Sequence, residues 1–149
     1  GTIGYYGNFM GYNITGDFNI VKGSDPGSES GPIAHVPPFF GKFEISKNLD
    51  LFKLKLLCLY AGHKPADEFD EAGVDNIDET PLLITENGEE GWAGSPGWWT
   101  LSFYIKYKLN SSFGLQVGCD NILDAHYKTF GSGVSAPGRN LIITINYGF

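Results

Sequence analysis

Carboxylates are concentrated in one segment of the chain, where they could hold a metal ion. Ten of the 17 acidic residues lie between Asp67 and Glu90. Ca²⁺ takes several carboxylate and carbonyl oxygens as ligands, so a Ca²⁺ site is one interpretation of this segment. The spacing does not match an EF-hand loop, however. We favour the other interpretation, a solvated loop that its charge keeps soluble, and predict no metal or cofactor.

The residues that most often carry catalysis are scattered. His35, His63 and His126 stand in or beside different loops, and the sequence holds no HExxH or GxSxG element. Cys58 and Cys119 lack the CxxC spacing of redox and zinc sites and are expected to be small apolar wall residues. A disulfide between them would need neighbouring strands at matching height. We therefore predict that the protein is not an enzyme, and a hydrolase stays only as a third hypothesis.

Lysines share one face of two apolar segments, and they could bias that face toward anions. These four residues are Lys53, Lys55, Lys106 and Lys108. An ordinary solvated face is the interpretation we prefer. The net charge is −7 and the basic residues are spread out, so we predict no nucleic-acid partner.

These residues depend for their positions on β-strands, of which the last is the clearest. Successive side chains of a strand point to opposite faces. In the segment 141–149 one face would carry Leu141, Ile143, Ile145, Tyr147 and Phe149, and the other Ile142, Thr144, Asn146 and Gly148. One face suits lipid and the other suits water. Taken alone, the segment fits equally well a half-buried strand of a soluble protein.

Further alternating segments predict an all-β fold, an antiparallel meander of about six strands. The strands are expected at Tyr12–Val21, Phe39–Ser46, Leu51–Ala61, Trp99–Leu109, Phe113–Asp120 and Leu141–Phe149. The 21 Gly, 11 Phe, 8 Tyr and 3 Trp agree with strands and turns. No apolar run is long enough for a membrane-spanning helix. Residues 1–9 stay open, as the end of a preceding strand or a disordered lead.

The connections alternate in length, which favours a membrane barrel. Short turns at 47–50 and 110–112 alternate with long loops at 23–38, 62–98 and 124–140. Outer-membrane barrels have short periplasmic turns and long extracellular loops. Aromatic residues near strand ends would form the girdles at the two interfaces. They are Tyr12, Tyr60, Trp98, Trp99, Tyr107, Phe113, Tyr147 and Phe149.

A motif near the C-terminus resembles that of TonB-dependent outer-membrane receptors. The segment Asp120-Asn121-Ile122-Leu123-Asp124-Ala125-His126-Tyr127 is similar to the family's N-(I/L)-(L/F)-D-x-x-Y element. A loop, the turn Pro137-Gly138-Arg139 and a last strand ending in Phe149 follow in the family's order. The segment His35-Val36-Pro37-Pro38 and a Trp-Thr-Leu after a long loop also look like that family.

The resemblance implies a segment of a 22-stranded transmembrane β-barrel in the bacterial outer membrane. Residues 1–149 would be about the last quarter of a receptor, without its N-terminal plug and TonB-contacting part. The implied function is TonB-dependent uptake of a scarce ligand, such as an iron chelate, cobalamin or an oligosaccharide. The implied partners are outer-membrane lipid, the remaining strands and plug, and TonB. Gly1, without a preceding Met or signal peptide, suggests a processed or trimmed chain.

The motif residues are expected to do structural work. Asp120 and Asn121 are small polar residues at a strand end, and Asp124 can accept backbone N–H bonds in the following turn. Leu123 belongs to the same element. Tyr127 offers an interface anchor, and the Arg139 guanidinium could tie loop carboxylates to the barrel rim. The resemblance further implies that Phe149 is read by the outer-membrane assembly machinery.

Ligand contacts in a complete receptor are expected from loop aromatics, namely Phe69, Trp92 and Trp98. The alternative to a transport protein is a small soluble β-barrel or sandwich that binds a ligand or a protein partner. As a piece of the receptor barrel, the six strands would have two open edges, which invite self-association of the isolated chain.

Overall fold

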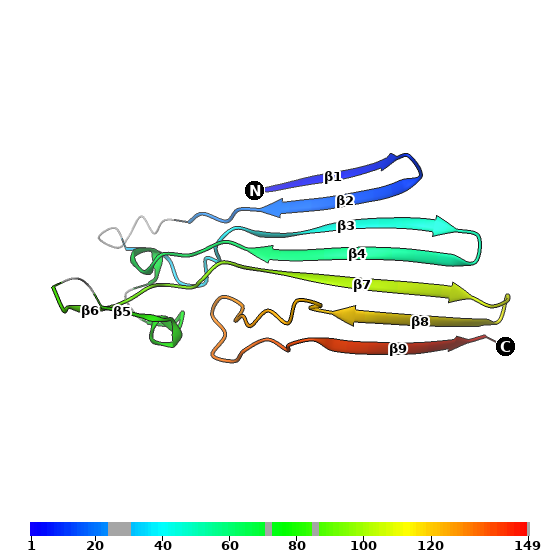
Figure 1. Ribbon diagram of the computed structural model, residues 1–149. Helices are drawn as coiled ribbons and strands as arrows, with labels where there is room; N and C mark the ends of the chain where they lie inside the picture. Colours follow the sequence, from blue (N-terminus) through cyan, green and yellow to red (C-terminus); the bar gives the residue numbers. More distant parts are fainter. Residues whose placement is uncertain (24–30, 71–72, 85–86, 149) are drawn as a thin grey trace.

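The computed structural model describes residues 1–23, 31–70, 73–84 and 87–148. Seven strands form one antiparallel sheet, in which each strand pairs with its neighbours along the chain (Figure 1). They are β1 (Thr2–Phe9), β2 (Tyr12–Asn19), β3 (Phe40–Leu49), β4 (Phe52–Ala61), β7 (Trp98–Lys108), β8 (Phe113–Asp120) and β9 (Asn140–Tyr147). The predicted all-β meander is therefore confirmed.

The sheet has seven strands where the sequence predicted six, because residues 1–9 form β1. All eight residues of β1 pair with β2. The two strands are joined by Met10 and Gly11, whose φ angles of 50° and 79° are both positive. A two-residue turn of this kind matches the twist of paired strands. Methionine is an unusual residue in such a turn, and for this reason the turn was not predicted.

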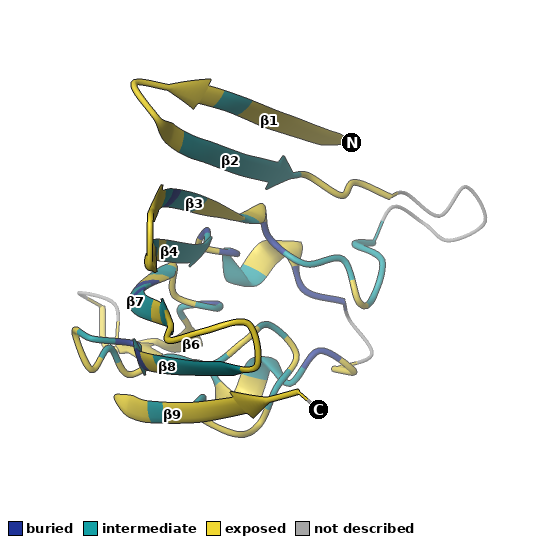
Figure 2. Ribbon diagram, turned by 90° about the vertical axis from the view of Figure 1, so that its right-hand side faces the viewer, coloured by how far each residue is buried: buried dark blue, intermediate teal, exposed yellow. Residues whose placement is uncertain are grey.

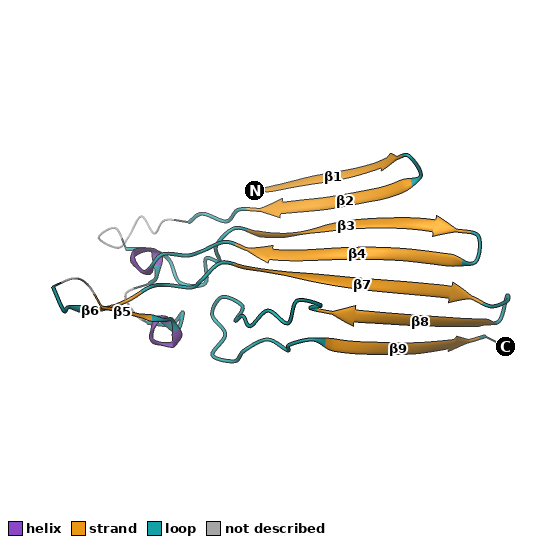
Figure 3. Cartoon of the chain, viewed as in Figure 1, coloured by secondary structure: helices purple, strands orange, loops and turns teal. Residues whose placement is uncertain are grey.

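The two ends of the sheet differ as the loop lengths predicted. Tight turns join β1 to β2, β3 to β4 and β7 to β8 at one end, the short-turn end (Figure 1). The described parts of the long loops 20–39, 62–97 and 121–139 lie at the opposite end, the long-loop end. The loop 62–97 contains the short helical turns η1 (Ala66–Glu68) and η2 (Ile77–Glu79) and a separate hairpin of β5 (Leu82–Ile84) and β6 (Glu90–Trp92), all at the long-loop end (Figure 3).

Strand register gives the sheet two chemically different faces. The outer face carries rows of apolar side chains, one of which is Ile14, Ile45, Leu56, Phe103, Cys119 and Leu141. The inner face carries polar rows, one of which is Asp17, Lys42, Leu59 and Thr100. The outer face is thus apolar along the length of the strands, although nothing in the described chain covers it.

Aromatic residues gather at both ends of the outer face. Phe52 stacks on Tyr107 near the short turns, with ring centroids 4.7 Å apart. At the other end Phe18 stacks on Phe39 at 5.5 Å and lies 6.4 Å from Tyr60. Two girdles of this kind are typical of membrane barrels. Trp98, which we had assigned to a girdle, pairs with Ala61 and lies on the inner face, whereas Trp99 lies on the outer face.

Burial is inverted relative to a water-soluble protein. In the described part of the chain, Phe69 is the one large hydrophobic side chain that is buried. The buried polar residues are Ser46, Lys64, Asp70, Asp75, Thr100, Ser102 and Asn121. On β9, by contrast, Leu141 and Ile143 expose 77% and 71% of their surface, and Figure 2 shows the strand exposed along most of its length. Apolar side chains therefore face outward from this sheet.

The cysteines belong to different strand pairs. Cys58 on β4 pairs with Phe43 and Leu101, and Cys119 on β8 pairs with Phe103 and Leu141. The strand β7 lies between β4 and β8, so the two cysteines are not on neighbouring strands. Both thiols are free. Among the described residues, no helix has both the length and the apolar character needed to cross a bilayer.

Candidate functional site

The motif after β8 forms a network of hydrogen bonds around Asn121. Its side chain is buried, and its backbone takes a positive φ of 46°. The amide Nδ2 donates to the carbonyls of Ala125 at 2.9 Å and Pro137 at 3.3 Å, and Oδ1 accepts from the Ala125 N–H at 2.9 Å. The Asn121 N–H donates to Ser102 Oγ at 3.3 Å. The Asn121 side chain thus joins the two ends of loop 121–139, and its backbone N–H ties them to β7.

Asp124 and Arg139 fasten the same loop to the start of β9. Asp124 Oδ1 accepts the Arg139 N–H at 2.7 Å, and Arg139 Nε donates to the Ile122 carbonyl at 2.9 Å. We had expected the guanidinium to bind loop carboxylates; it binds a backbone carbonyl instead. At Gly138 an added Cβ would lie 2.6 Å from Asp124 Oδ1, so a larger residue would displace the carboxylate. Leu123 is half exposed on this loop.

This hydrogen-bonded loop positions Tyr127 against the inner face of β7. Tyr127 and Trp98 have ring centroids 4.1 Å apart at an interplanar angle of 31°. The Tyr127 carbonyl accepts the Ala136 N–H at 2.8 Å, which closes the loop behind the ring. Aromatic contacts of this kind add about 0.5–1.5 kcal/mol beyond the burial of area. The motif therefore positions an aromatic wall at the long-loop end.

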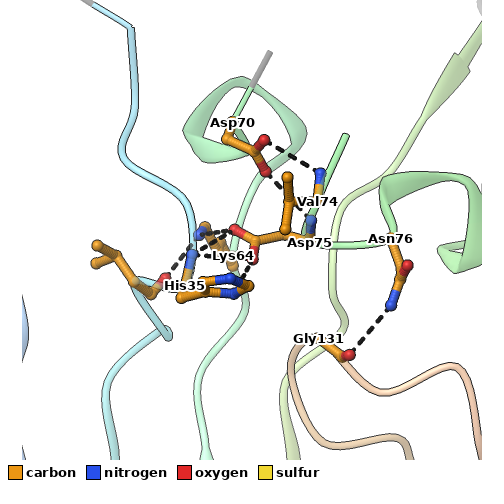
Figure 4. A network of polar contacts seen from close by, with 8 residues as sticks. His35, Lys64, Asp70, Val74, Asp75, Asn76 and Gly131 are labelled. Atoms are coloured by element: carbon orange, nitrogen blue, oxygen red, sulfur yellow. Dashed lines mark hydrogen bonds and ion pairs between the residues drawn. The ribbon is translucent and has the colours of Figure 1, made fainter. Parts of the chain in front are cut away.

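A buried ion pair within loop 62–97 is hydrogen-bonded to residues of the loop that precedes β3 (Figure 4). Lys64 Nζ lies 3.7 Å from Asp75 Oδ2, and their side chains expose 2% and 0% of their surface. Nζ also donates to the Val36 carbonyl at 2.6 Å and lies 4.1 Å from the ring centroid of Phe130. A buried charge without partners would cost several kcal/mol. Lys64 has a carboxylate, a carbonyl and an aromatic ring, each from a different part of the chain.

The carboxylate of Asp75 is held from several sides. The His35 N–H donates to its oxygens at 2.9 and 3.1 Å, and His35 Nδ1 lies 3.1 Å from Oδ1. The neighbouring Asp70 carboxylate accepts the backbone N–H groups of Val74 at 3.1 Å and Asp75 at 3.2 Å (Figure 4). Two carboxylates of the acidic segment are thus buried structural groups, which corrects our interpretation of the segment as a solvated loop.

The described part of the acidic segment shows no arrangement of side chains suited to a metal ion. Among the described residues, no group of three or more His, Cys, Asp and Glu side chains is placed to hold an ion. Glu71 and Glu86 lie outside the described residues.

Aromatic packing completes the contact between the loops. Phe69 packs edge-on against Phe130, with centroids 5.6 Å apart, and Asn76 Nδ2 donates to the Gly131 carbonyl at 3.1 Å. Phe69 exposes 5% of its surface, whereas Trp92 on β6 exposes 39%. Of the three aromatics expected to contact a ligand, only Trp98 lies beside a pocket described below. Phe149 lies outside the described residues.

A pocket of about 320 Å³ opens between loops 62–97 and 121–139. Its lining includes Glu79, Pro96, Trp98, His126, Tyr127 and Lys128. Lys128 Nζ lies 2.8 Å from Glu79 Oε2, and this hydrogen bond and charge hold the pKa of Glu79 below its usual value. His126 Nε2 lies 3.0 Å from Ser135 Oγ. The site thus combines an aromatic wall with an acceptor and a donor that neutralise each other.

The inner-face lysines lie as predicted, but in two different settings. Lys55 lies 3.7 Å from Glu44 and 4.7 Å from the ring centroid of Tyr104. Lys53 and Lys106 stand directly opposite each other on β4 and β7, and with Lys108 they line a hollow of about 890 Å³ at the short-turn end. This hollow is wide open and lies far along the sheet from the pocket.

Sequence reasoning missed Lys64, Asp75 and the Glu79–Lys128 pair. One signal was present, because Lys64 is the single lysine in a loop that carries ten acidic residues. Its partners, however, come from separate loops. Their pairing requires knowledge of the tertiary structure.

No family model matches the chain, and no curated protein matches it. Solved structures do. OprC, named a copper transporter, aligns with 99% of the chain at a TM-score of 0.75 and 15% identity. The siderophore receptor PirA from Acinetobacter baumannii aligns with 97% at a TM-score of 0.69 and 16% identity. The ferric enterobactin receptor PfeA (G324V mutant) from Pseudomonas aeruginosa aligns with 95% at a TM-score of 0.61 and 13% identity.

The chain spans about a fifth of the length of these structures, namely 23%, 21% and 20%. All three are TonB-dependent receptors of the outer membrane. At 13–16% identity the likeness concerns the fold. The chain therefore has the fold of a segment of the β-barrel of TonB-dependent outer-membrane receptors, as the resemblance in its C-terminal motif implied.

Proposed function

We propose that the chain is a wall segment of a TonB-dependent outer-membrane receptor, to which it also contributes three surface loops. The receptor takes up a scarce ligand, such as an iron chelate, cobalamin or an oligosaccharide. Its remaining strands complete the barrel, its plug fills the lumen, and TonB supplies the force. In this assembly the outer face contacts lipid and the long-loop end faces the medium.

The observation that carries the proposal is the inverted burial of the sheet. Leu141, Ile143 and Ile145 expose 64–77% of their surface, whereas Thr100 and Ser102 of the inner face expose 3% and 5%. Each buried large apolar side chain contributes about 1.5–3 kcal/mol in water. A soluble protein would forgo that stabilisation on the whole outer face. A lipid environment explains the arrangement, because the outer face is then covered by acyl chains.

Loop packing supports the assignment of ends. The Lys64–Asp75 pair and the hydrogen bonds around Asn121 hold the long loops in a defined conformation. A surface that binds a ligand requires such a conformation. At the short-turn end the connections are only tight turns. We therefore infer that the ligand-binding surface lies at the long-loop end, where the loops pack against one another.

Cell fractionation and uptake test the proposal. The full-length protein should fractionate with the outer membrane. A deletion strain should lose uptake of one member of a panel made of a ferric chelate, cobalamin and an oligosaccharide. A strain that lacks TonB should show the same loss, and the gene on a plasmid should restore uptake. A protein found in the soluble fraction, or uptake that persists without TonB, would contradict the proposal.

A further inference from the structure

The pocket at the long-loop end has the features of a site for a small molecule. Its volume of about 320 Å³ lies at the small end of the range for ligand pockets, about 300–1,000 Å³. Such sites combine apolar walls with a few convergent polar groups. Here Trp98, Tyr127 and Pro96 supply the apolar wall, and Glu79 and Lys128 supply the polar groups.

Charge narrows the class of ligand. The Glu79 carboxylate and the Lys128 ammonium are 2.8 Å apart, so an anion would meet Glu79 and a cation would meet Lys128 at nearly the same place. Asp78 adds a further negative charge beside Glu79 in η2. A neutral ligand whose groups both donate and accept hydrogen bonds satisfies the pair without opposing either charge. Hydroxyl groups have this property.

Surface exposure keeps the pair available. Glu79 exposes 49% of its side chain and Lys128 33%. Both therefore have hydrogen-bonding positions left over for a ligand. A hydrogen bond to a charged group is worth about 1.5–3 kcal/mol, which is more than one between neutral groups.

The aromatic wall narrows the class further. Trp98 and Tyr127 pack against each other at a centroid distance of 4.1 Å and a tilt of 31°, and both residues line the pocket. A ligand that matches both parts of the site needs an apolar face and a hydroxylated rim. A pyranose ring has both.

The wall is held in place before any ligand arrives. Tyr127 is positioned by the loop that Asn121 ties to β7, and Trp98 is part of a regular strand. Glu79 follows the buried Asp75 by four residues in a segment fixed by Lys64. Preorganised groups bind with less entropic cost.

We propose that this pocket binds one ring of a neutral saccharide, with the ring face against Trp98 and Tyr127 and its hydroxyls on Glu79 and Lys128. The proposal deepens the proposed function and rests on it, because it names the class of scarce ligand that the receptor takes up. The loops would then select a neutral glycan over charged chelates.

Tryptophan fluorescence tests the site. In a variant in which Trp92, Trp99 and any tryptophan outside residues 1–149 are replaced by phenylalanine, Trp98 is the remaining tryptophan, and its emission reports the occupation of the pocket. The purified protein, in a zwitterionic detergent that has no sugar headgroup, is titrated with methyl glycosides of glucose, galactose and mannose. Glucuronate, glucosamine and phenol serve as an anionic ring, a cationic ring and an aromatic ring. We expect a saturable change with at least one neutral glycoside, at an affinity about tenfold higher than for the charged rings.

Three variants locate the binding. Glu79→Gln should weaken the glycoside by about tenfold, since a hydrogen bond to a charged acceptor is replaced by one to a neutral amide oxygen. Asp78→Asn, at the neighbouring carboxylate outside the pocket lining, should leave the affinity unchanged. Tyr127→Ala should abolish the response. Because Tyr127→Ala could also disturb the fold of its loop, the comparison of Glu79→Gln with the control Asp78→Asn decides whether the glycoside binds in this pocket.

The outcomes separate this proposal from the proposed function. Failure of every neutral glycoside, tighter binding of glucuronate, glucosamine or phenol, or equal effects of Glu79→Gln and Asp78→Asn would overturn the saccharide site, even if TonB-dependent uptake is found. Glycoside binding that Glu79→Gln weakens, in a protein that fractionates as soluble, would support the site and overturn the uptake function instead.

Discussion

The two ends of the sheet are stabilised in different ways. At the long-loop end, Lys64, Phe69, Asp75 and Asn121 are buried by contacts between segments far apart in the sequence. At the short-turn end the strands are joined by tight turns, and Lys53 stands opposite Lys106. The long-loop end carries its own packing. The short-turn end and the outer face depend on what surrounds them.

The contrast between the two ends indicates that the long loops, rather than the strands, hold most of the side-chain packing in this segment. The strands share backbone hydrogen bonds with their neighbours but bury few side chains. The loops, which in most proteins are the less ordered part, hold most of the buried residues. Each of the following changes tests whether the two ends differ as described.

The largest expected effect is at the buried ion pair. Asp75→Ala leaves Lys64 buried without its carboxylate, which we expect to cost about 3–5 kcal/mol. Hydrogen exchange of the amides in residues 62–80 measures the loss. The exposed Asp78→Ala should change exchange by no more than about 0.5 kcal/mol. Equal effects at the two positions would show that the loop core is not stabilised by the pair.

A lysine on the outer face should be the next most costly. Ile143→Lys places a charge in the middle of the outer face and should destabilise a bilayer-inserted sheet by about 2–4 kcal/mol. Thr144→Lys, on the inner face of the same strand, should be tolerated. Denaturant unfolding in phospholipid vesicles gives both values. If the two variants are equally stable, β9 does not have a lipid face.

Asparagine side chains at the two ends offer a matched comparison. Asn121→Ala removes three hydrogen bonds that a buried side chain makes to backbone groups of Ala125 and Pro137, at a cost of about 1–3 kcal/mol. Asn110→Ala removes two hydrogen bonds, to the N–H groups of Ser112 and Phe113, but water can replace them because Asn110 is exposed. Unfolding free energies should therefore differ. A larger loss for Asn110→Ala would contradict the contrast between the two ends.

The smallest effect is expected at the short-turn end. Like charges directly opposite each other on paired strands are unfavourable. Lys106→Glu replaces the repulsion between Lys53 and Lys106 with attraction, and should raise the unfolding free energy by about 0.2–1 kcal/mol at low salt. Lys108→Glu, opposite Gly114, is the control with no lysine across from it. No gain for Lys106→Glu over the control would mean that the repulsion is screened.

Strands were predictable because each outer-face side chain follows a simple alternation. The segment Phe113–Asp120 was found with the observed bounds, and the others within a few residues. In β1 the alternation is hidden, since Gly7 interrupts the apolar outer face, Tyr6 lies on the inner face and Met10 gives no turn signal. The face of Trp98 was also misjudged, because two adjacent tryptophans necessarily point to opposite faces and only one can join a girdle.

The loop core could not be predicted in the same way. Lys64 meets Val36 across 28 residues, His35 meets Asp75 across 40, and Asn76 meets Gly131 across 55. Nothing in a local pattern marks which of ten acidic residues in one loop will be buried. The motif Asn121 to Tyr127 was visible in the sequence, but the partner ring of Tyr127 was not.

The adjacent residues Trp98 and Trp99 test most directly whether the sheet has one face for lipid and one for the interior. The variants W92F/W98F and W92F/W99F, in which any tryptophan outside residues 1–149 is also replaced by phenylalanine, are inserted into vesicles whose lipids carry brominated acyl chains. We expect that emission from Trp99, 54% exposed on the outer face, is strongly quenched, while Trp98, stacked on Tyr127, keeps most of its emission. Equal quenching of the two tryptophans would contradict it.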